Sequence, residues 1–350
     1  MTAPTTHTSR GEDDTRPRPL PWRRMAGVTW RQHRIALIGV AVLLGALAVY
    51  LWIAGTSLHD AYDAAVACHP QSSAACQGLD NTVSGMDNFL SNGYILQVLP
   101  VLIGAFVGAP VLARELETGT FRYAWTQGFG RRRWAVAKLM LLAVVVTAAA
   151  GAFGALLTWY YQPFLSDHEF LGLPKTSPFA PGMFDLRGVG FPAWTLAAFA
   201  IGVLAGMLIR RVVPAIATTL VVYTGLAFAA AGFLREHYLA PLLTSNPNVN
   251  LPSNAWIVST WWTRDGRVAF GDYPPASILN QFCPPTSSVK GGGASEGWGP
   301  CLLQHGYTMW TSYQPTSRFW PFQWIEGGWL LALSVLLIAA ATWLVQHRAA

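Results

Sequence analysis

Long apolar runs separated by polar connectors make up most of this 350-residue chain. Six of them approach the roughly 20 apolar residues that are needed to cross a hydrocarbon core about 30 Å thick. They are residues 35–54, 95–113, 139–161, 192–209, 212–234 and 327–345. Their interiors contain no charged side chain, which argues against a proton relay, a voltage sensor or an ion-coupled carrier. The pattern predicts an all-α polytopic membrane protein with six transmembrane helices.

The segment before the first apolar run divides into two parts. Residues 1–20 are rich in Thr, Arg, Pro and Asp without apolar periodicity, which predicts a disordered tail. In residues 21–34, Trp22 and Trp30 alternate with arginines, which suits a short helix lying in the membrane interface. A basic flank that only orients the first span is the simpler interpretation, and the two are compatible. The transmembrane domain is therefore expected over residues 21–346.

Composition supports a membrane protein and argues against a nucleic-acid partner. The chain is 52% hydrophobic and 11% charged, whereas soluble domains carry about 25% charged residues. Many of its 16 tryptophans lie near the ends of apolar runs, where an amphipathic ring is stabilised at headgroup level. The net charge is +6, but the cations form no single stripe with interleaved aromatic residues. Membrane lipids are the expected surroundings.

Charge is distributed unevenly among the connectors. The connector 114–138 contains six cations and two acids. Together with residues 1–34, 210–211 and 347–350, it holds sixteen of the 23 cations but only five of the 17 acids. By the positive-inside rule these segments face the cytoplasm. We therefore expect a multi-pass protein of the plasma membrane with both termini cytoplasmic and with extracellular loops at 55–94 and 235–326.

All four cysteines lie in the two predicted outer loops. Cys68 and Cys76 are in the first, and Cys283 and Cys301 are in the second. Four cysteines allow three connectivities. Pairing within each loop needs no long-range contact and suits an oxidising exterior, so two such disulfides are favoured. The spacing does not resemble a metal knuckle, and no metal site is expected.

The last part of the second outer loop, residues 313–326, is aromatic and precedes the sixth span. An interfacial anchor is the simpler interpretation, and a cover over an exit path is the more specific one. Glu326 is expected at the start of the last helix, where the helix dipole favours a carboxylate. Trp324 and Glu326 are also a candidate outer gate, which we rank below the capping role.

Small residues recur at helical spacing and allow helices to approach closely in lipid. The pairs are Gly104 with Gly108, Gly151 with Ala155, and Gly202 with Gly206. Packing within the chain is favoured over a dimer seam for each of them. Pro100, Pro110 and Pro214 are candidates for helix kinks.

Motifs that would supply enzymatic chemistry are missing from the sequence. It contains no Gly-x-x-x-x-Gly-Lys-Ser/Thr phosphate loop, so the chain is not by itself an ATPase of that class. It also contains no Gly-x-Ser-x-Gly nucleophile elbow and no His-Glu-x-x-His pair. We therefore do not expect an enzyme.

In the connector 114–138, two acids and a Gly-Thr pair follow the second apolar run, and three arginines and a lysine lead into the third. These residues are Glu115, Glu117, Gly119, Thr120, Arg131, Arg132, Arg133 and Lys138. The pattern resembles the signature of permease subunits of ABC-2 type exporters, also called type V exporters, in which an acidic residue and a Gly-Thr pair follow the second span and an arginine and a lysine enter the next helix. The segment from Tyr313 to Glu326 is similar to an actinobacterial subgroup, whereas the tripled arginine and the cysteine-bearing loops depart from the family pattern.

This resemblance implies two permease chains, identical or related, working with two ATP-binding subunits on separate polypeptides. ATP and Mg²⁺ would be bound by those partners and no cofactor by this chain. Closing of the ATP-binding subunits would move residues 114–138, the coupling loop, and would switch a central path from inward to outward. The expected cargo is a hydrophobic or amphipathic small molecule, a drug or a lipid. The alternatives are a non-transporting anchor or sensor, an immunity-type protein and, less favoured, a membrane-embedded enzyme.

Overall fold

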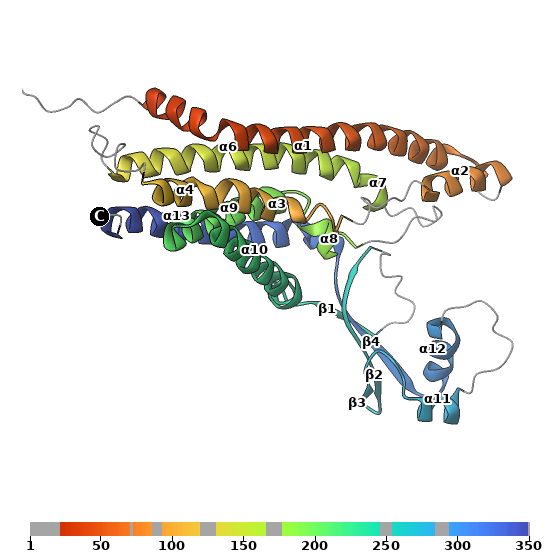
Figure 1. Ribbon diagram of the computed structural model, residues 1–350. Coiled ribbons are helices and arrows are strands. Elements are labelled where there is room, and N and C mark those ends of the chain that lie inside the picture. Colours follow the sequence, from red (N-terminus) through yellow and green to blue (C-terminus); the bar gives the residue numbers. More distant parts are fainter. Residues whose placement is uncertain are drawn as a thin grey trace, which may run out of the picture.

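The computed structural model describes residues 22–70, 73–85, 93–119, 131–165, 177–245, 254–283 and 294–348. The tail predicted for residues 1–20 and the coupling-loop residue Thr120 lie outside these ranges. Within them the chain is mostly helical, as predicted. Figure 1 shows long helices side by side and a small β-sheet projecting from one end of them.

Among the residues that the structure describes, six helical segments are long and apolar enough to cross a membrane, which confirms the predicted number of spans. They are Thr29–Ala67, Val98–Thr118, Arg133–Tyr160, Gly190–Ile209, Val212–His237 and Thr316–His347. Several extend beyond the predicted apolar runs because helices continue into polar sequence at their ends. We call the end of the bundle that holds the start of the third span and the end of the sixth span the terminal end, and the opposite end the sheet end (Figure 1).

The N-terminal helix is continuous with the first span. Helix α1 (Trp22–Ala67) has 46 residues and includes the segment for which a separate interfacial helix was predicted. No proline follows Pro21 in this stretch, so the backbone hydrogen-bond ladder is not interrupted. Helix α2 (Ala74–Gly85) comes next, and the Cys68–Cys76 disulfide links it to the end of α1. The first predicted outer loop is thus largely helical where the structure describes it.

The second span contains a wide turn. It consists of α3 (Val98–Ile103), a π turn η1 (Gly104–Gly108) and α4 (Ala109–Thr118). In the π turn, the Ala109 N–H donates to the Gly104 carbonyl, five residues earlier. Pro110 follows directly, and a proline ring normally clashes with the carbonyl four residues before it. The wide turn gives that ring space, so the predicted irregularity at Pro110 takes the form of a π turn.

This span packs closely against α9 (Gly190–Ile209) through glycines. A Cβ atom added to Gly202 would lie 2.4 Å from the Gly104 carbonyl oxygen, and one added to Gly206 would lie 2.3 Å from the Ala109 carbonyl oxygen. These glycines therefore let the two backbones touch within the chain, as expected. Gly151 differs, since a Cβ there would meet nothing within 4 Å.

Gly202→Ala is expected to lower the free energy of unfolding by about 1–3 kcal/mol, because α9 must move away from the second span. The matched control is Gly151→Ala on α6 (Arg131–Tyr160), where a methyl group has open space and the alanine favours the helix. Denaturant unfolding of both variants in detergent measures the difference. Equal stability of the two would contradict this account of the packing.

Between the third span and the fourth, the described residues form two short helices. They are α7 (Gln162–Leu165) and α8 (Pro181–Phe184), which precede α9. Helix α9 is joined to α10 (Val212–Ala229) by Arg210 and Arg211 alone, as predicted, with Arg210 in a left-handed conformation at φ 58°. Helix α10 then continues as a π turn η2 (Ala230–Leu234) and a 3₁₀ turn η3 (Arg235–His237).

The second predicted outer loop contains a four-stranded antiparallel sheet, which the sequence analysis missed. Its strands are β1 (Leu242–Thr244), β2 (Trp256–Arg264), β3 (Arg267–Phe270) and β4 (Tyr307–Gln314), in the order β1-β4-β2-β3. Helices α11 (Ala276–Phe282) and α12 (Ala294–Gln304) lie beside it (Figure 1). The Cys283–Cys301 disulfide joins the end of α11 to α12, so both predicted pairings are confirmed.

The last helix begins earlier than predicted. After the 3₁₀ turn η4 (Thr316–Arg318), helix α13 runs over Phe319–Arg348 and includes most of the aromatic segment that was expected to be a connector. Phe319 and Phe322 are buried with Phe179 and Phe184 in an aromatic cluster at the sheet end. These two phenylalanines therefore belong to the core, whereas Trp320 and Trp324 of the same segment are exposed, so the predicted interfacial anchor stays a prediction for the tryptophans.

Candidate functional sites at the two ends of the bundle

An ion pair joins the second and third spans at the terminal end. Lys138 on α6 donates from Nζ to Glu115 Oε1 on α4 at 2.7 Å and to the Val111 carbonyl at 3.1 Å. The lysine side chain is 1% exposed and the glutamate side chain 15% exposed. Burial removes both charges from water, so each depends on the other for compensation. The two spans are held together at this point.

Glu117 connects the same end of α4 to the fifth span. Its Oε2 accepts a hydrogen bond from the Val212 N–H at 3.1 Å. Val212 is the first residue of α10, where backbone amides lack partners within the helix and the dipole favours a carboxylate. Two acids of the coupling-loop sequence therefore tie α4 to α6 and to α10.

The other predicted coupling residues lie along the same stretch. Gly119 caps α4 at φ 70°, a left-handed conformation that glycine adopts without strain. Arg131, Arg132 and Arg133 belong to the first turn of α6, and Arg133 is half-buried. Because α4 extends to Thr118 and α6 begins at Arg131, both flanks of the predicted loop 114–138 are helical. Thr120 lies outside the described residues.

At the sheet end, three charged residues from distant parts of the chain form a buried cluster. Arg235 in η3 donates from Nη2 to Glu326 Oε1 at 2.9 Å and from Nε to Glu326 Oε2 at 3.1 Å. Nη2 also donates to Asp185 Oδ1 in the turn after α8. The side chains of Arg235 and Glu326 are each 1% exposed. We call Asp185, Arg235 and Glu326 the ion cluster.

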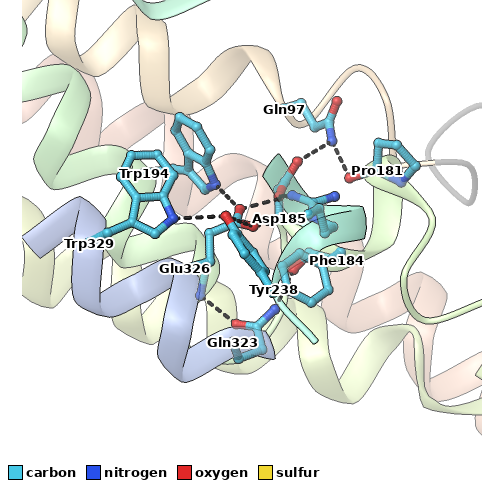
Figure 2. Close-up of polar contacts among 11 residues, drawn as sticks. Gln97, Pro181, Phe184, Asp185, Trp194, Tyr238, Gln323, Glu326 and Trp329 are labelled. Carbon is cyan, nitrogen blue, oxygen red and sulfur yellow. Dashed lines mark hydrogen bonds and ion pairs between the residues drawn. The ribbon is translucent and has the colours of Figure 1, made fainter. Parts of the chain in front are cut away.

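Uncharged donors complete the ion cluster. Figure 2 shows Glu326 with Trp194 and Tyr238 around it; the indole N–H of Trp194 donates to Oε1 at 2.9 Å and the Tyr238 hydroxyl to Oε2 at 3.2 Å. Trp329 donates in turn to the Tyr238 hydroxyl at 2.8 Å. Gln97 donates to Asp185 Oδ2 at 3.1 Å and so brings the start of the second span into contact with the cluster.

The predicted role of Glu326 as a helix-start carboxylate is therefore wrong. Helix α13 begins at Phe319, so Glu326 lies beyond its first turn and bonds to side chains of other elements. The two residues of the candidate gate also have different surroundings, because Trp324 is 64% exposed on α13 whereas Glu326 is buried. The two residues lie on different faces of the helix.

The irregular end of the fifth span places Arg235. The π turn η2 is closed by the Arg235 N–H, which donates to the Ala230 carbonyl five residues earlier. Phe233 and Leu234 point outward and are exposed, whereas Arg235 is buried. A π turn shifts the residues after it around the helix axis, and such turns are frequent at functional sites. Here the turn brings a cation into the interior.

Burial and the negative charge of Glu326 raise the pKa of Asp185 from 3.8 to about 7, although the Arg235 guanidinium opposes this change. The cluster contains two carboxyl groups and one guanidinium, so its charge is −1 when both acids are ionised. Protonation of Asp185 makes it neutral. Burial also raises the pKa of Tyr238, which keeps its hydroxyl proton available to Glu326.

Stability is expected to depend on pH through Asp185. Between about pH 4 and pH 7 the folded chain binds more protons at this residue than the unfolded chain, so the free energy of unfolding falls as the pH rises. Asp185→Asn removes this contribution. Unfolding measured at intervals across this range should therefore show a smaller loss for the variant than for the wild type, and identical pH profiles would refute the assignment.

A group with metal-ligand atoms occurs beside the sheet. Cys283, Cys301 and His305 have their ligand atoms within 4.8 Å of one another. The two sulfur atoms are joined in the disulfide, however, and thiolates are the form of cysteine that binds metals. This group is therefore a disulfide with a neighbouring histidine.

The six helices in the described part of the chain that are long and apolar enough to cross a membrane define a multi-pass membrane protein. The family described as ABC-2 membrane transporter related matches residues 41–235, more than half of the chain. The protein belongs to that family, whose members are membrane components of ABC transporters and generally work with an ATP-binding subunit. No curated protein and no solved structure matches the chain.

The matched region contains the terminal-end network and part of the ion cluster. It includes Glu115, Glu117 and Lys138, and it ends at Arg235. Glu326 and the sheet lie beyond it. The family match does not separate subgroups, so the resemblance to an actinobacterial subgroup stays a prediction.

Proposed function

We propose that this chain is the permease subunit of an ATP-driven exporter in the plasma membrane. Its cargo would be a hydrophobic or amphipathic small molecule, a drug or a lipid. The observation that carries the proposal is the terminal-end network, in which Glu115, Glu117 and Lys138 link the second, third and fifth spans of a chain from a transporter family. A membrane anchor has no need for such a connection.

The proposed orientation puts the terminal end in the cytoplasm, with both termini there. The concentration of cations in residues 1–34 and 114–138 supports it by the positive-inside rule. The two disulfides support it as well, because they lie in segments assigned to the oxidising exterior. The sheet would then be extracellular.

In this proposal, an ATP-binding subunit docks at the coupling loop 114–138. Movement of α4 would be passed to α6 through the Lys138–Glu115 ion pair and to α10 through Glu117. The ion cluster at the sheet end would hold the second, fifth and sixth spans together until they rearrange. ATP and Mg²⁺ belong to the partner, and a second permease chain, identical or related, would complete the path.

Affinity purification of the tagged chain from its native membrane, followed by mass spectrometry, tests the partner. An ATP-binding cassette subunit should be recovered with the wild type and be depleted with Glu117→Lys, because this exposed acid lies within the proposed docking segment. Glu236→Lys, a charge reversal at the opposite end, is the matched control and should retain the partner.

Equal recovery of the subunit with Glu117→Lys and Glu236→Lys would show that the ATP-binding subunit does not dock at residues 114–138. Purification of the chain without any ATP-binding subunit, under conditions that preserve known transporter complexes, would contradict the exporter proposal itself. Thermal unfolding of each variant shows whether the fold is retained, since Glu117 also caps α10.

A further inference from the structure

A cavity of about 560 Å³ lies beside the ion cluster. Its walls come from the start of the second span, the turn after α8, helix α9 and the end of the fifth span. Most lining side chains are apolar or aromatic, with Val101, Ala227 and Ala231 among them. A concave, mostly apolar site with a few polar groups is the usual form of a small-molecule site.

Asp185 gives this cavity its charge. Among the described residues that line the cavity, the ionisable side chains are those of Tyr94, Asp185 and Tyr223. Asp185 is the only one of the three that is not a tyrosine. Gln97, which also lines the cavity, holds one carboxylate oxygen of Asp185 in place. The other oxygen faces Arg235, so the carboxylate is fixed at the boundary between the cluster and the cavity.

The neighbouring cations are directed elsewhere. Arg235 does not line the cavity, and its guanidinium lies over the Phe184 ring at 4.1 Å while it bonds to both acids. Arg187, two residues after Asp185, lies over the Phe319 ring at 4.9 Å. One guanidinium faces two carboxylates in the cluster, so the charge left over for the cavity is negative when both are ionised.

Aromatic rings add a second feature that suits a cation. Tyr94, Trp194 and Tyr223 all line the cavity, and an organic cation near an aromatic face is stabilised by the ring quadrupole. Besides these tyrosines, the titratable groups that face Asp185 are Arg235, Glu326 and, through Glu326, Tyr238. The apolar walls meanwhile accept the body of a molecule that bears a single charge.

We propose that this cavity binds an organic monocation with an apolar or aromatic body, whose charged end lies against the Asp185 carboxylate. That such a cation is the transported cargo rests on the proposed function, and it narrows the cargo to cationic amphiphiles. That the cation binds in the cavity depends only on the cavity and its charge.

The test uses two probes of the same shape and opposite charge, tetraphenylphosphonium and tetraphenylborate. Radiolabelled tetraphenylphosphonium should bind saturably to the purified chain in nanodiscs and be displaced by the unlabelled cation. Radiolabelled tetraphenylborate, measured in a separate sample because the two ions precipitate together, should show no saturable binding. Asp185→Asn should weaken the binding at least tenfold, the loss expected on removing a charge partner worth about 1.4 kcal/mol. Affinity in the wild type should also rise between pH 5.5 and 8 as Asp185 ionises, and the variant should show no such rise.

A second pair of variants leaves the ion cluster intact. Ala231→Trp fills the cavity from η2, whereas Ala217→Trp places the same side chain on an exposed face of α10 away from it. The first should abolish tetraphenylphosphonium binding and the second should retain it. Saturable binding of tetraphenylborate, unchanged tetraphenylphosphonium binding in Ala231→Trp, or unchanged tetraphenylphosphonium binding in a folded Asp185→Asn would overturn the proposal.

Failure of this inference can be told apart from failure of the proposed function. If an ATP-binding subunit purifies with the chain but tetraphenylphosphonium does not bind, the exporter remains and the cationic cargo is wrong. If the probe binds as described but no ATP-binding subunit is recovered, the cation site remains and its assignment to transport is wrong.

Discussion

Replacing Arg235 with methionine is expected to lower the free energy of unfolding by about 3–5 kcal/mol, the typical cost of removing one partner of a buried ion pair. Methionine fills part of the same space but leaves Glu326, which is 1% exposed, without its cation. Asp185 loses the same partner. Chemical unfolding in detergent, followed by tryptophan fluorescence, measures the change.

Two further variants make this prediction specific. Arg267→Met removes an exposed arginine on β3 and should change stability by only a few tenths of a kcal/mol. Glu326→Gln added to Arg235→Met should recover part of the loss, because the carboxylate left without a partner is then neutral. The prediction is wrong if Arg235→Met and Arg267→Met lose the same stability, or if the added Glu326→Gln recovers nothing.

Lys138→Met is expected to cost about 3 kcal/mol, near the lower limit for breaking a buried pair. The lysine is almost fully buried, but Glu115 is 15% exposed and can regain some hydration once its partner is gone. The variant should also reduce stimulation of ATP hydrolysis in the assembled transporter, since α4 and α6 lose their connection. Unfolding and ATPase assays on the same preparations measure the two effects.

A double-mutant cycle isolates the ion pair. Lys138→Met, Glu115→Gln and the combination should give an interaction energy of about 1–3 kcal/mol, because the two residues share one hydrogen bond and one charge interaction. Additive losses would show that the lysine acts through its hydrogen bond to the Val111 carbonyl or through packing instead.

The six spans could be predicted from sequence because bilayer thickness sets a minimum length for an apolar helix. The disulfides were predictable for a related reason, as cysteines 8 and 18 residues apart meet without help from distant segments. Both inferences depend on local sequence. The same is true of the tight turn at Arg210 and Arg211.

The ion cluster was not predictable in this way. Asp185, Arg235 and Glu326 are separated by 50 and 91 residues, and no spacing within any one segment relates them. Arg235 follows a long apolar run and Glu326 precedes another, so each looked like a residue at the membrane boundary. Only the packing of three elements, with a π turn in one of them, brings the charges together.

The sheet and the hydrogen bonds of the terminal-end network are two other features that were not predicted from the sequence. Strand β2 contains Trp261 and Trp262 among threonines and β-branched residues, and Asp265 and Gly266 form the turn before β3, a typical hairpin signal. The strands are short beside the apolar spans, and their hairpin signal is correspondingly weak. At the terminal end the family resemblance singled out Glu115, Glu117 and Lys138, but their bonds to one another and to α10 became visible only in the fold.

We propose that residues 114–138 couple the spans of this chain to ATP hydrolysis by a separate subunit. The most direct measurement is the rate of ATP hydrolysis by the purified assembly in nanodiscs, compared with the ATP-binding subunit alone. We expect the chain to stimulate hydrolysis, Glu117→Lys to remove the stimulation and Glu236→Lys to retain it. A rate that is the same with and without the chain, or that is unaffected by Glu117→Lys in an intact assembly, would contradict the proposal.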